Sequence, residues 1–134
     1  MELSDKEKAA IIEYRIQKSF SVLIEAEDNA RLCHWSLTAN RLYYAVFHMA
    51  SALLTDKGIS AKTHTGVIGL IGKEFVQKNL LNTDDAKLIS RLQNMRQSGD
   101  YDDMFDWSEN DVAPLIEPTK KLLDKMHKML KTAK

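Results

Sequence analysis

Arg41 and His48 are the residues whose types and spacing best suit chemistry on a phosphate group. Seven residues of helix make two turns with about 20° of residual rotation, so both side chains would share one face with Tyr44. A guanidinium can hold phosphate through two hydrogen bonds, and an imidazole titrates near neutral pH. The pair would suit RNA phosphodiester cleavage, with His48 as acid or base and Arg41 on the developing charge. The same spacing fits an Arg41 paired with a carboxylate and a core His48 satisfied by a carbonyl.

A second set of candidates comprises Arg96, Asp100 and Tyr101. Residues four apart meet on one face of a helix, so Arg96 and Asp100 can contact each other there. Arg96 could bind phosphate. Alternatively, it could form an ordinary surface ion pair that stabilises the fold by about 0.3 kcal/mol.

Two further motifs fail to match known binding loops. A phosphate loop needs a glycine, four further residues, then Gly-Lys and a hydroxyl residue. Around Gly72-Lys73, Val67 stands at the glycine position and Glu74 at the hydroxyl position. The acidic run between residues 100 and 106 lacks the oxygen ligand and the glycine of an EF-hand loop. We interpret the first as a helix-packing segment and the second as a solvated loop.

The histidines and the single cysteine do not predict a metal site or a nucleophile. No two histidines form a zinc-binding pair with a carboxylate companion, so we expect no metal and no cofactor. Cys33 and His34 are adjacent, and adjacent helical residues point about 100° apart, which favours an inert thiol.

The elements that must position these candidates are helical throughout. Hydrophobic residues recur with helical spacing, and no alternating run of strand length occurs. Ser4 and Glu7 form a capping-box pattern at the first helix. Glycines 66, 69 and 72 predict a ridge that a neighbouring backbone can approach closely. We expect one domain over residues 1–134, an all-α up-and-down bundle of about five helices near 5–32, 37–57, 63–80, 83–98 and 108–131.

Composition limits the classes of function. The chain has 134 residues with 19 basic and 19 acidic side chains, so only a local patch could attract nucleic acid. Lys121, Lys125 and Lys128 lie on one face of the last predicted helix and form either such a patch or a solvated face. The absence of a signal-peptide pattern, a long apolar run and a second cysteine predicts a cytoplasmic protein without membrane contact.

The order of these blocks resembles the HEPN domain family, particularly small members encoded beside a minimal nucleotidyltransferase. The resemblance covers the whole chain and rests on three blocks. They are Asn40-Arg41-Leu42-Tyr43-Tyr44-Ala45-Val46-Phe47-His48, Lys62-Thr63-His64-Thr65-Gly66, and Arg96 with Asp100-Tyr101.

This resemblance implies a helical bundle that dimerises and, in many members, an RNase site between protomers. That site is an arginine and a following histidine with four to six residues between them, often near a tyrosine that the nucleotidyltransferase modifies. Arg41 and His48 match this spacing. On the fourth helix, Arg96 and Tyr101 match the arginine and tyrosine, but Asp100 stands where a histidine is expected and lacks its proton at pH 7.

We therefore predict a protein that binds RNA or a nucleotide. Its predicted role is that of the RNase toxin in a two-protein system whose other member is a nucleotidyltransferase. The alternative is a noncatalytic module that docks that enzyme and a nucleotide. An apolar second helix with more surface than one bundle covers predicts a homodimer. The catalytic candidates are Arg96, His48, Arg41 and His64, and the binding candidates are Asn40, Tyr44, Lys62, Asp100 and Tyr101.

Overall fold

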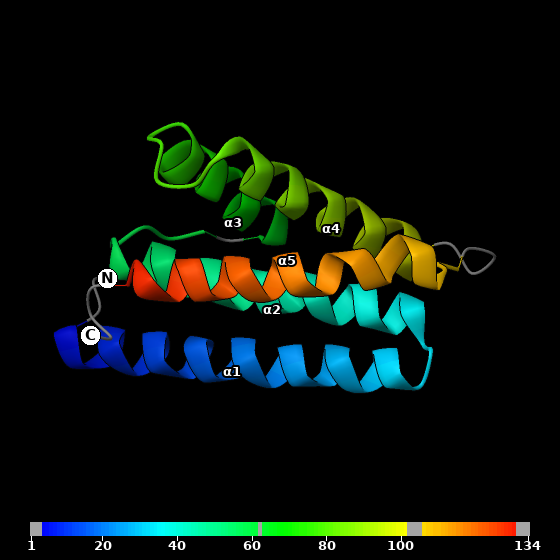
Figure 1. Cartoon of the computed structure of the whole chain (residues 1–134). Helices are drawn as coiled ribbons and strands as arrows, with labels where there is room; N and C mark the ends of the chain where they lie inside the picture. Colours follow the sequence, from blue (N-terminus) through cyan, green and yellow to red (C-terminus); the bar gives the residue numbers. More distant parts are fainter. Residues whose placement is uncertain (1–3, 62, 102–105, 131–134) are drawn as a thin grey trace.

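The computed structural model describes residues 4–61, 63–101 and 106–130, and within these ranges the chain is helical without any strand. The helices pack into one bundle (Figure 1). Their bounds are α1 Asp5–Arg31, α2 Trp35–Asp56, α3 His64–Ile71, the π-helix η1 Gly72–Val76, α4 Thr83–Tyr101 and α5 Glu109–Lys128. The expected all-α bundle of five helices is confirmed.

Helix α1 lies antiparallel along α2 on one side of the bundle (Figure 1). The predicted capping box begins it: the Glu7 amide donates to Ser4 Oγ and the Ser4 amide donates to Glu7 Oε1, both at 3.1 Å. Midway along the pair, the buried Ser19 hydroxyl donates to the Ala45 carbonyl at 2.7 Å. This bond sets the axial register of α1 against α2.

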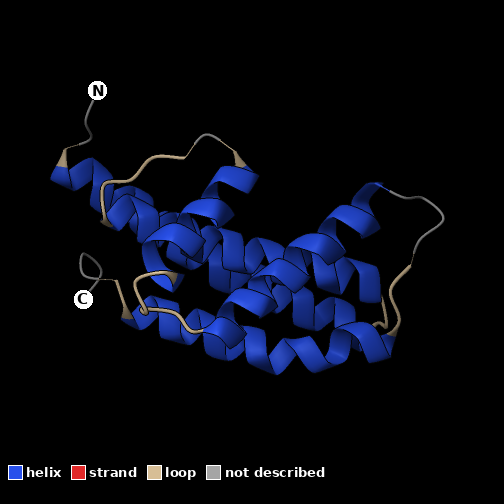
Figure 2. Cartoon of the chain, turned by 90° about the horizontal axis from the view of Figure 1, so that it is seen from above, coloured by secondary structure: helices blue, strands red, loops and turns tan. Residues whose placement is uncertain are grey.

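Helix α2 is the central helix, as its apolar composition predicts. It packs against α1, α3, α4 and α5. The view from above shows helices joined by loops, with no strand among the described residues (Figure 2). Large side chains such as Leu42, Tyr43, Met49 and Leu53 are at most 1 % exposed. One stripe of α2 remains half-buried instead, and it carries Arg41, Tyr44 and His48.

The third predicted helix divides into α3 and η1. Its glycine ridge is not a site of close packing, because a Cβ at Gly69 or Gly72 would meet nothing within 4 Å. That expectation was wrong: these glycines mark the change from α- to π-helical winding rather than a close contact. The wider winding of η1 turns Phe75 into the core, where it is 2 % exposed.

Asn82, rather than Thr83, caps helix α4. The Asp85 amide donates to Asn82 Oδ1 at 2.8 Å, and the Asn82 amide donates to Asp85 Oδ2 at 3.0 Å. Helix α5 begins after Ser108, whose amide donates to Asp111 Oδ2 at 3.1 Å. These cap bonds mark the first turns of α4 and α5.

Exposed apolar side chains lie chiefly on α1 rather than on α2. Apart from Leu37, the described part of α2 does not expose the surplus apolar surface expected there, because the bundle buries it within one chain. The large exposed apolar residues are Ile11, Tyr14, Ile24, Leu32, Leu37 and Leu80. None of the helices in the described ranges combines the length and hydropathy needed to cross a bilayer.

Candidate functional site

Arg41 lies on the half-buried stripe of α2 and is held by two neighbours. Its Nε and Nη2 donate to Asn40 Oδ1 at 3.0 and 2.7 Å, and its Nη1 donates to Glu25 Oε1 on α1 at 3.1 Å. The guanidinium carbon lies 5.3 Å from the centre of the Tyr44 ring. The alternative in which Arg41 pairs with a carboxylate is thus the observed arrangement.

Arg96 reaches the same tyrosine from α4. Its Nη2 donates to the Tyr44 hydroxyl at 3.1 Å, and its guanidinium carbon lies 5.6 Å from the Tyr44 ring and 5.8 Å from the Tyr43 ring. Arg96 is half-buried. It is therefore packed against aromatic rings rather than confined to a surface ion pair with Asp100, so truncating it also removes packing.

His48 contacts an arginine that the sequence patterns did not single out. Arg15 on α1 places Nη1 2.8 Å from His48 Nδ1, and its guanidinium carbon lies 5.7 Å from the Phe47 ring. A guanidinium has donors but no acceptor, so Nδ1 accepts this bond and the neutral ring keeps its hydrogen on Nε2. At Nδ1 the partner is a cation, whereas the core interpretation of His48 expected a bond with a carbonyl.

Three guanidinium groups from three helices thus surround one aromatic stripe. We call this set the arginine cluster: Arg15, Arg41 and Arg96 with Tyr44 and His48. The rings of Tyr43, Tyr44 and Phe47 connect it, with centroids 5.1 to 6.4 Å apart. Each of these guanidinium carbons lies 5.3 to 5.8 Å from a ring centre, and guanidinium groups are the donors that bind phosphate oxygens in pairs.

The cluster favours binding phosphate over transferring protons. Protonation of His48 at Nδ1 would place a positive imidazolium against the positive Arg15 guanidinium, which is unfavourable. Nδ1 can act as a base only after it releases its bond to Arg15. The sequence signal that could have revealed Arg15 is its position between Ile12 and Ile16, which places a charge at the border of a buried stripe.

Four candidates cannot be placed in this way. Lys62 lies outside the described residues. Helix α3 begins at His64 and α4 ends at Tyr101. The side chains of His64, Asp100 and Tyr101 are outside the described part of the chain, so their predicted roles stay predictions. Among the described side chains, no group of three or more metal-ligating residues gathers.

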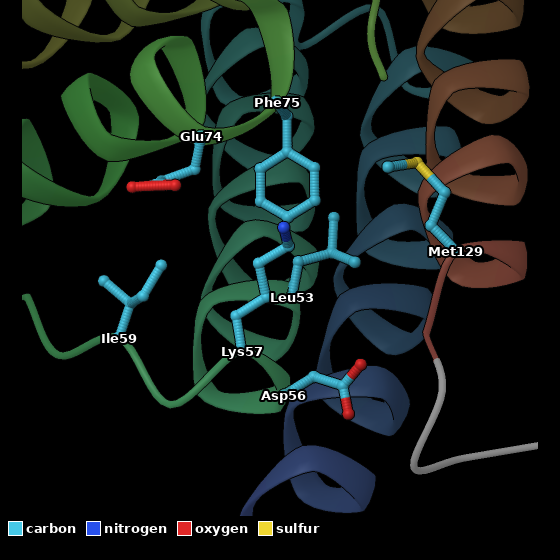
Figure 3. Close-up of a pocket in the computed structure, with 7 residues that line it drawn as sticks. All are labelled: Leu53, Asp56, Lys57, Ile59, Glu74, Phe75 and Met129. Carbon is cyan, nitrogen blue, oxygen red and sulfur yellow. The ribbon is translucent and has the colours of Figure 1, made fainter. Parts of the chain in front are cut away.

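A pocket of about 390 Å³ lies elsewhere, at the end of α2 (Figure 3). Phe75 points into it toward Lys57, whose Nζ is 5.0 Å from the ring centre. None of the five candidates with described side chains, Asn40, Arg41, Tyr44, His48 and Arg96, lines it. Its lining residues are Leu53, Asp56, Lys57, Ile59, Glu74, Phe75 and Met129.

The lysine face of α5 is largely occupied by acids. Lys125 Nζ lies 2.6 Å from Asp85 Oδ2, and Lys128 Nζ lies 3.0 Å from Asp124 Oδ2. Carboxylate pairing makes this face a poorer phosphate surface than the arginine cluster, and it fits the solvated-face interpretation.

Comparison with known proteins identifies relatives along most of the chain. The family model described as "HEPN domain" matches residues 12–129. A "UPF0332 protein" of Thermotoga maritima is 34 % identical over 131 residues, covering 96 % of this chain and 97 % of the relative. "Putative toxin MJ0142" of Methanocaldococcus jannaschii is 30 % identical over 119 residues, covering 89 % and 81 %. "Putative toxin MJ0605" of the same organism is 33 % identical over 91 residues, covering 68 % and 67 %.

Proposed function

Because the chain belongs to the HEPN domain family, we propose that it is an RNA-binding toxin component whose arginine cluster holds the RNA backbone. The observation that carries the proposal is the convergence of Arg15, Arg41 and Arg96 from α1, α2 and α4. The names of two relatives as toxins support the cellular role.

The chemistry of the cluster matches single-stranded RNA. Guanidinium groups bind phosphates bidentately, and single-stranded RNA presents unpaired bases that can stack on guanidinium planes and on the faces of aromatic rings. Tyr44 is half-buried between Arg41 and Arg96, so one tyrosine lies between two phosphate ligands. Binding here requires the phosphate to compete with Glu25 for Arg41.

Cleavage is the second candidate function, and it depends on His48. If Arg15 moved to a phosphate, Nδ1 would be released and the imidazole could accept a proton. In the observed arrangement Arg15 holds that nitrogen. We therefore place binding first and cleavage second.

The test is a binding titration with a fluorescein-labelled single-stranded RNA of about twelve nucleotides at low salt. Arg15→Gln, Arg41→Gln and Arg96→Gln should each weaken binding about tenfold and reduce the dependence of affinity on salt. Arg91→Gln is the matched control, since Arg91 also stacks on an aromatic ring, that of Trp107, but lies outside the cluster.

Equal affinity of the control and the three cluster variants would contradict this assignment. A gel of the same RNA after incubation separates the two candidates: intact RNA with wild-type affinity supports binding alone. Cleavage that His48→Gln and His48→Asn both abolish, in folded protein, would make the RNase role the correct one.

The partner in this proposal is a minimal nucleotidyltransferase, and the assembled form is a homodimer. Toxicity should appear when the chain is expressed alone and disappear when the enzyme is expressed with it. A nucleotidyltransferase gene beside the gene for this chain would support the pairing. Growth unaffected by either expression would count against a toxin and leave a binding module.

A further inference from the structure

The pocket at the end of α2 combines apolar walls with a few charged groups. Its apolar walls come from separate elements: Leu53 from α2, Phe75 from η1, Met129 from the end of α5, and Ile59 from the loop after α2. Its volume of about 390 Å³ falls in the range of small-molecule sites. At about 30 Å³ for each water-sized group, this volume holds a ligand of about ten heavy atoms.

Lys57 brings a positive charge into this pocket. Its Nζ lies 5.0 Å from the centre of the Phe75 ring, and Figure 3 shows the side chain pointing at that ring. Among the described residues, Lys57 forms no salt bridge and donates no hydrogen bond from its ammonium group. An ammonium group has three donors, and a ring face does not replace an acceptor oxygen. These donors are therefore available to a ligand.

The acidic side chains at the pocket do not neutralise this charge. Glu74 Oε2 accepts a hydrogen bond from Lys78 Nζ at 2.8 Å, and Figure 3 shows the Glu74 carboxylate turned away from Phe75. The charges of Lys57 and Lys73 also act on Glu74. With Asp56 included, three ammonium groups are set against two carboxylates at this end of α2. The excess of one positive charge favours an anion.

We propose that the pocket binds a small monocarboxylate with an apolar body, of the kind represented by a short-chain fatty acid. The carboxylate accepts hydrogen bonds from Lys57 Nζ, and the apolar body lies against Leu53, Ile59 and Met129. A charge-assisted hydrogen bond orients the ligand, and burial of its apolar body supplies the rest of the affinity. This site is separate from the arginine cluster and does not depend on RNA binding.

The same contacts disfavour other classes of small ligand. A cation would have to displace Lys57 from the Phe75 ring and enter a region of net positive charge. A phosphate monoester would bring nearly two negative charges and three acceptor oxygens to one ammonium group. A neutral apolar molecule would take the Lys57 ammonium group out of water without giving it an acceptor.

Titration of ¹⁵N-labelled full-length protein with sodium hexanoate tests the site. The backbone amide signals of Leu53, Lys57, Ile59 and Phe75 should shift and saturate, with a Kd of about 1 mM for so small a ligand. Sodium acetate keeps the carboxylate but lacks the apolar chain, so it should not saturate at the same concentrations. Hexanamide and hexylamine keep the chain but lack the negative charge, and each should bind at least about tenfold more weakly.

Two lysine variants separate the proposed contact from a general effect of charge. Lys57→Gln removes the ammonium group in the pocket and should weaken hexanoate binding about tenfold or more. Lys73→Gln is the matched control, because it removes one charge near Glu74 without altering the pocket lining, and it should weaken binding less than about threefold. Lys57 and Lys73 are both exposed, so both variants should fold, which circular dichroism verifies.

Several outcomes would overturn this proposal. Equal affinities of Lys57→Gln and the wild type would remove Lys57 from the site, and hexanamide or hexylamine binding as tightly as hexanoate would exclude recognition of a carboxylate. Saturable shifts around Tyr44 in place of the pocket would assign hexanoate to the arginine cluster. Shifts that stay linear up to about 20 mM would show that no such site exists. None of these measurements uses RNA, so their failure leaves the RNA-binding proposal standing, and the reverse also holds.

Discussion

The middle of α2 and its C-terminal end present different kinds of site. Around Tyr44 half-buried guanidinium groups come together from three helices, whereas at Lys57 there is a pocket whose charges already contact near neighbours. Lys57 lies over the Phe75 ring, and Glu74 accepts a bond from Lys78 at 2.8 Å. The contrast shows that the pocket with the volume to hold a ligand and the cluster of positive charge lie at different places on α2. A polyanion such as RNA requires aligned donors along a surface more than it requires enclosure.

The largest expected effect lies at the pocket, where Phe75→Ala should lower the free energy of unfolding by about 3–5 kcal/mol. Phe75 is 2 % exposed and joins η1 to α2, so truncation leaves a cavity. Urea denaturation measures the change, and Phe75→Leu should recover more than half of it. A loss below about 1 kcal/mol would show that the pocket wall closes over the deleted ring.

The next largest effect is on RNA affinity, which should depend on the arginine cluster and not on the pocket. Arg96→Lys retains the charge but loses the planar fork, so RNA affinity should fall about threefold to tenfold, whereas Lys57→Gln should leave it unchanged. Arg96→Lys should also cost about 1 kcal/mol of stability through weaker stacking on Tyr43 and Tyr44. A loss of RNA affinity in Lys57→Gln would move the RNA path toward the pocket.

Substitutions at His48 separate the stability that comes from its packing from the stability that comes from its hydrogen bond with Arg15. His48→Ala leaves Arg15 without this acceptor and should cost about 1–2 kcal/mol. His48→Gln supplies a carbonyl oxygen in its place and should cost less than half as much, with RNA affinity retained. Thermal unfolding and the RNA titration measure the two effects, and equal losses in both variants would show that the Arg15 bond adds no stability.

The smallest effect is a pH dependence at the pocket. The hydrogen bond from Lys78, with help from the charges of Lys78, Lys73 and Lys57, lowers the pKa of Glu74 below its ordinary 4.5. A lowered pKa stabilises the fold above pH 4.5, and this contribution is lost as the pH falls through the folded value. Glu74→Gln should flatten the decline of the urea midpoint between pH 5 and pH 3, and Glu13→Gln serves as the control.

Much of the fold could be predicted because local signals determine it. Ser4 with Glu7 marks the start of α1, Gly58 with a φ of 75° follows the end of α2, and the apolar run of α2 marks its central place. The division into α3 and η1 could not be predicted. A π-turn is decided by how Phe75 reaches the core, and that depends on tertiary packing rather than on the glycine spacing.

The candidate site was predicted to the extent that it lies on one helix. Spacing alone placed Arg41, Tyr44 and His48 on one face. Arg15 and Glu25 could not be found in this way, since they are 33 and 16 residues from their partners and only the packing of α1 on α2 brings them close. Those two residues decide the tautomer of His48 and the competition at Arg41, so the chemistry depends on contacts that periodicity does not contain.

The anchoring of Trp107 has a spectroscopic consequence. Its backbone amide donates to Ser36 Oγ at 2.9 Å, and its indole N–H donates to the Met95 carbonyl at 3.1 Å, one residue before Arg96. The other tryptophan of the chain, Trp35, precedes Ser36. Both fluorophores therefore lie near the start of α2, at the opposite end of that helix from the pocket, and only Trp107 bonds to the residue next to Arg96. The tryptophan fluorescence of unlabelled protein should therefore change when a ligand binds at Arg96. It should change little when a ligand binds at Lys57.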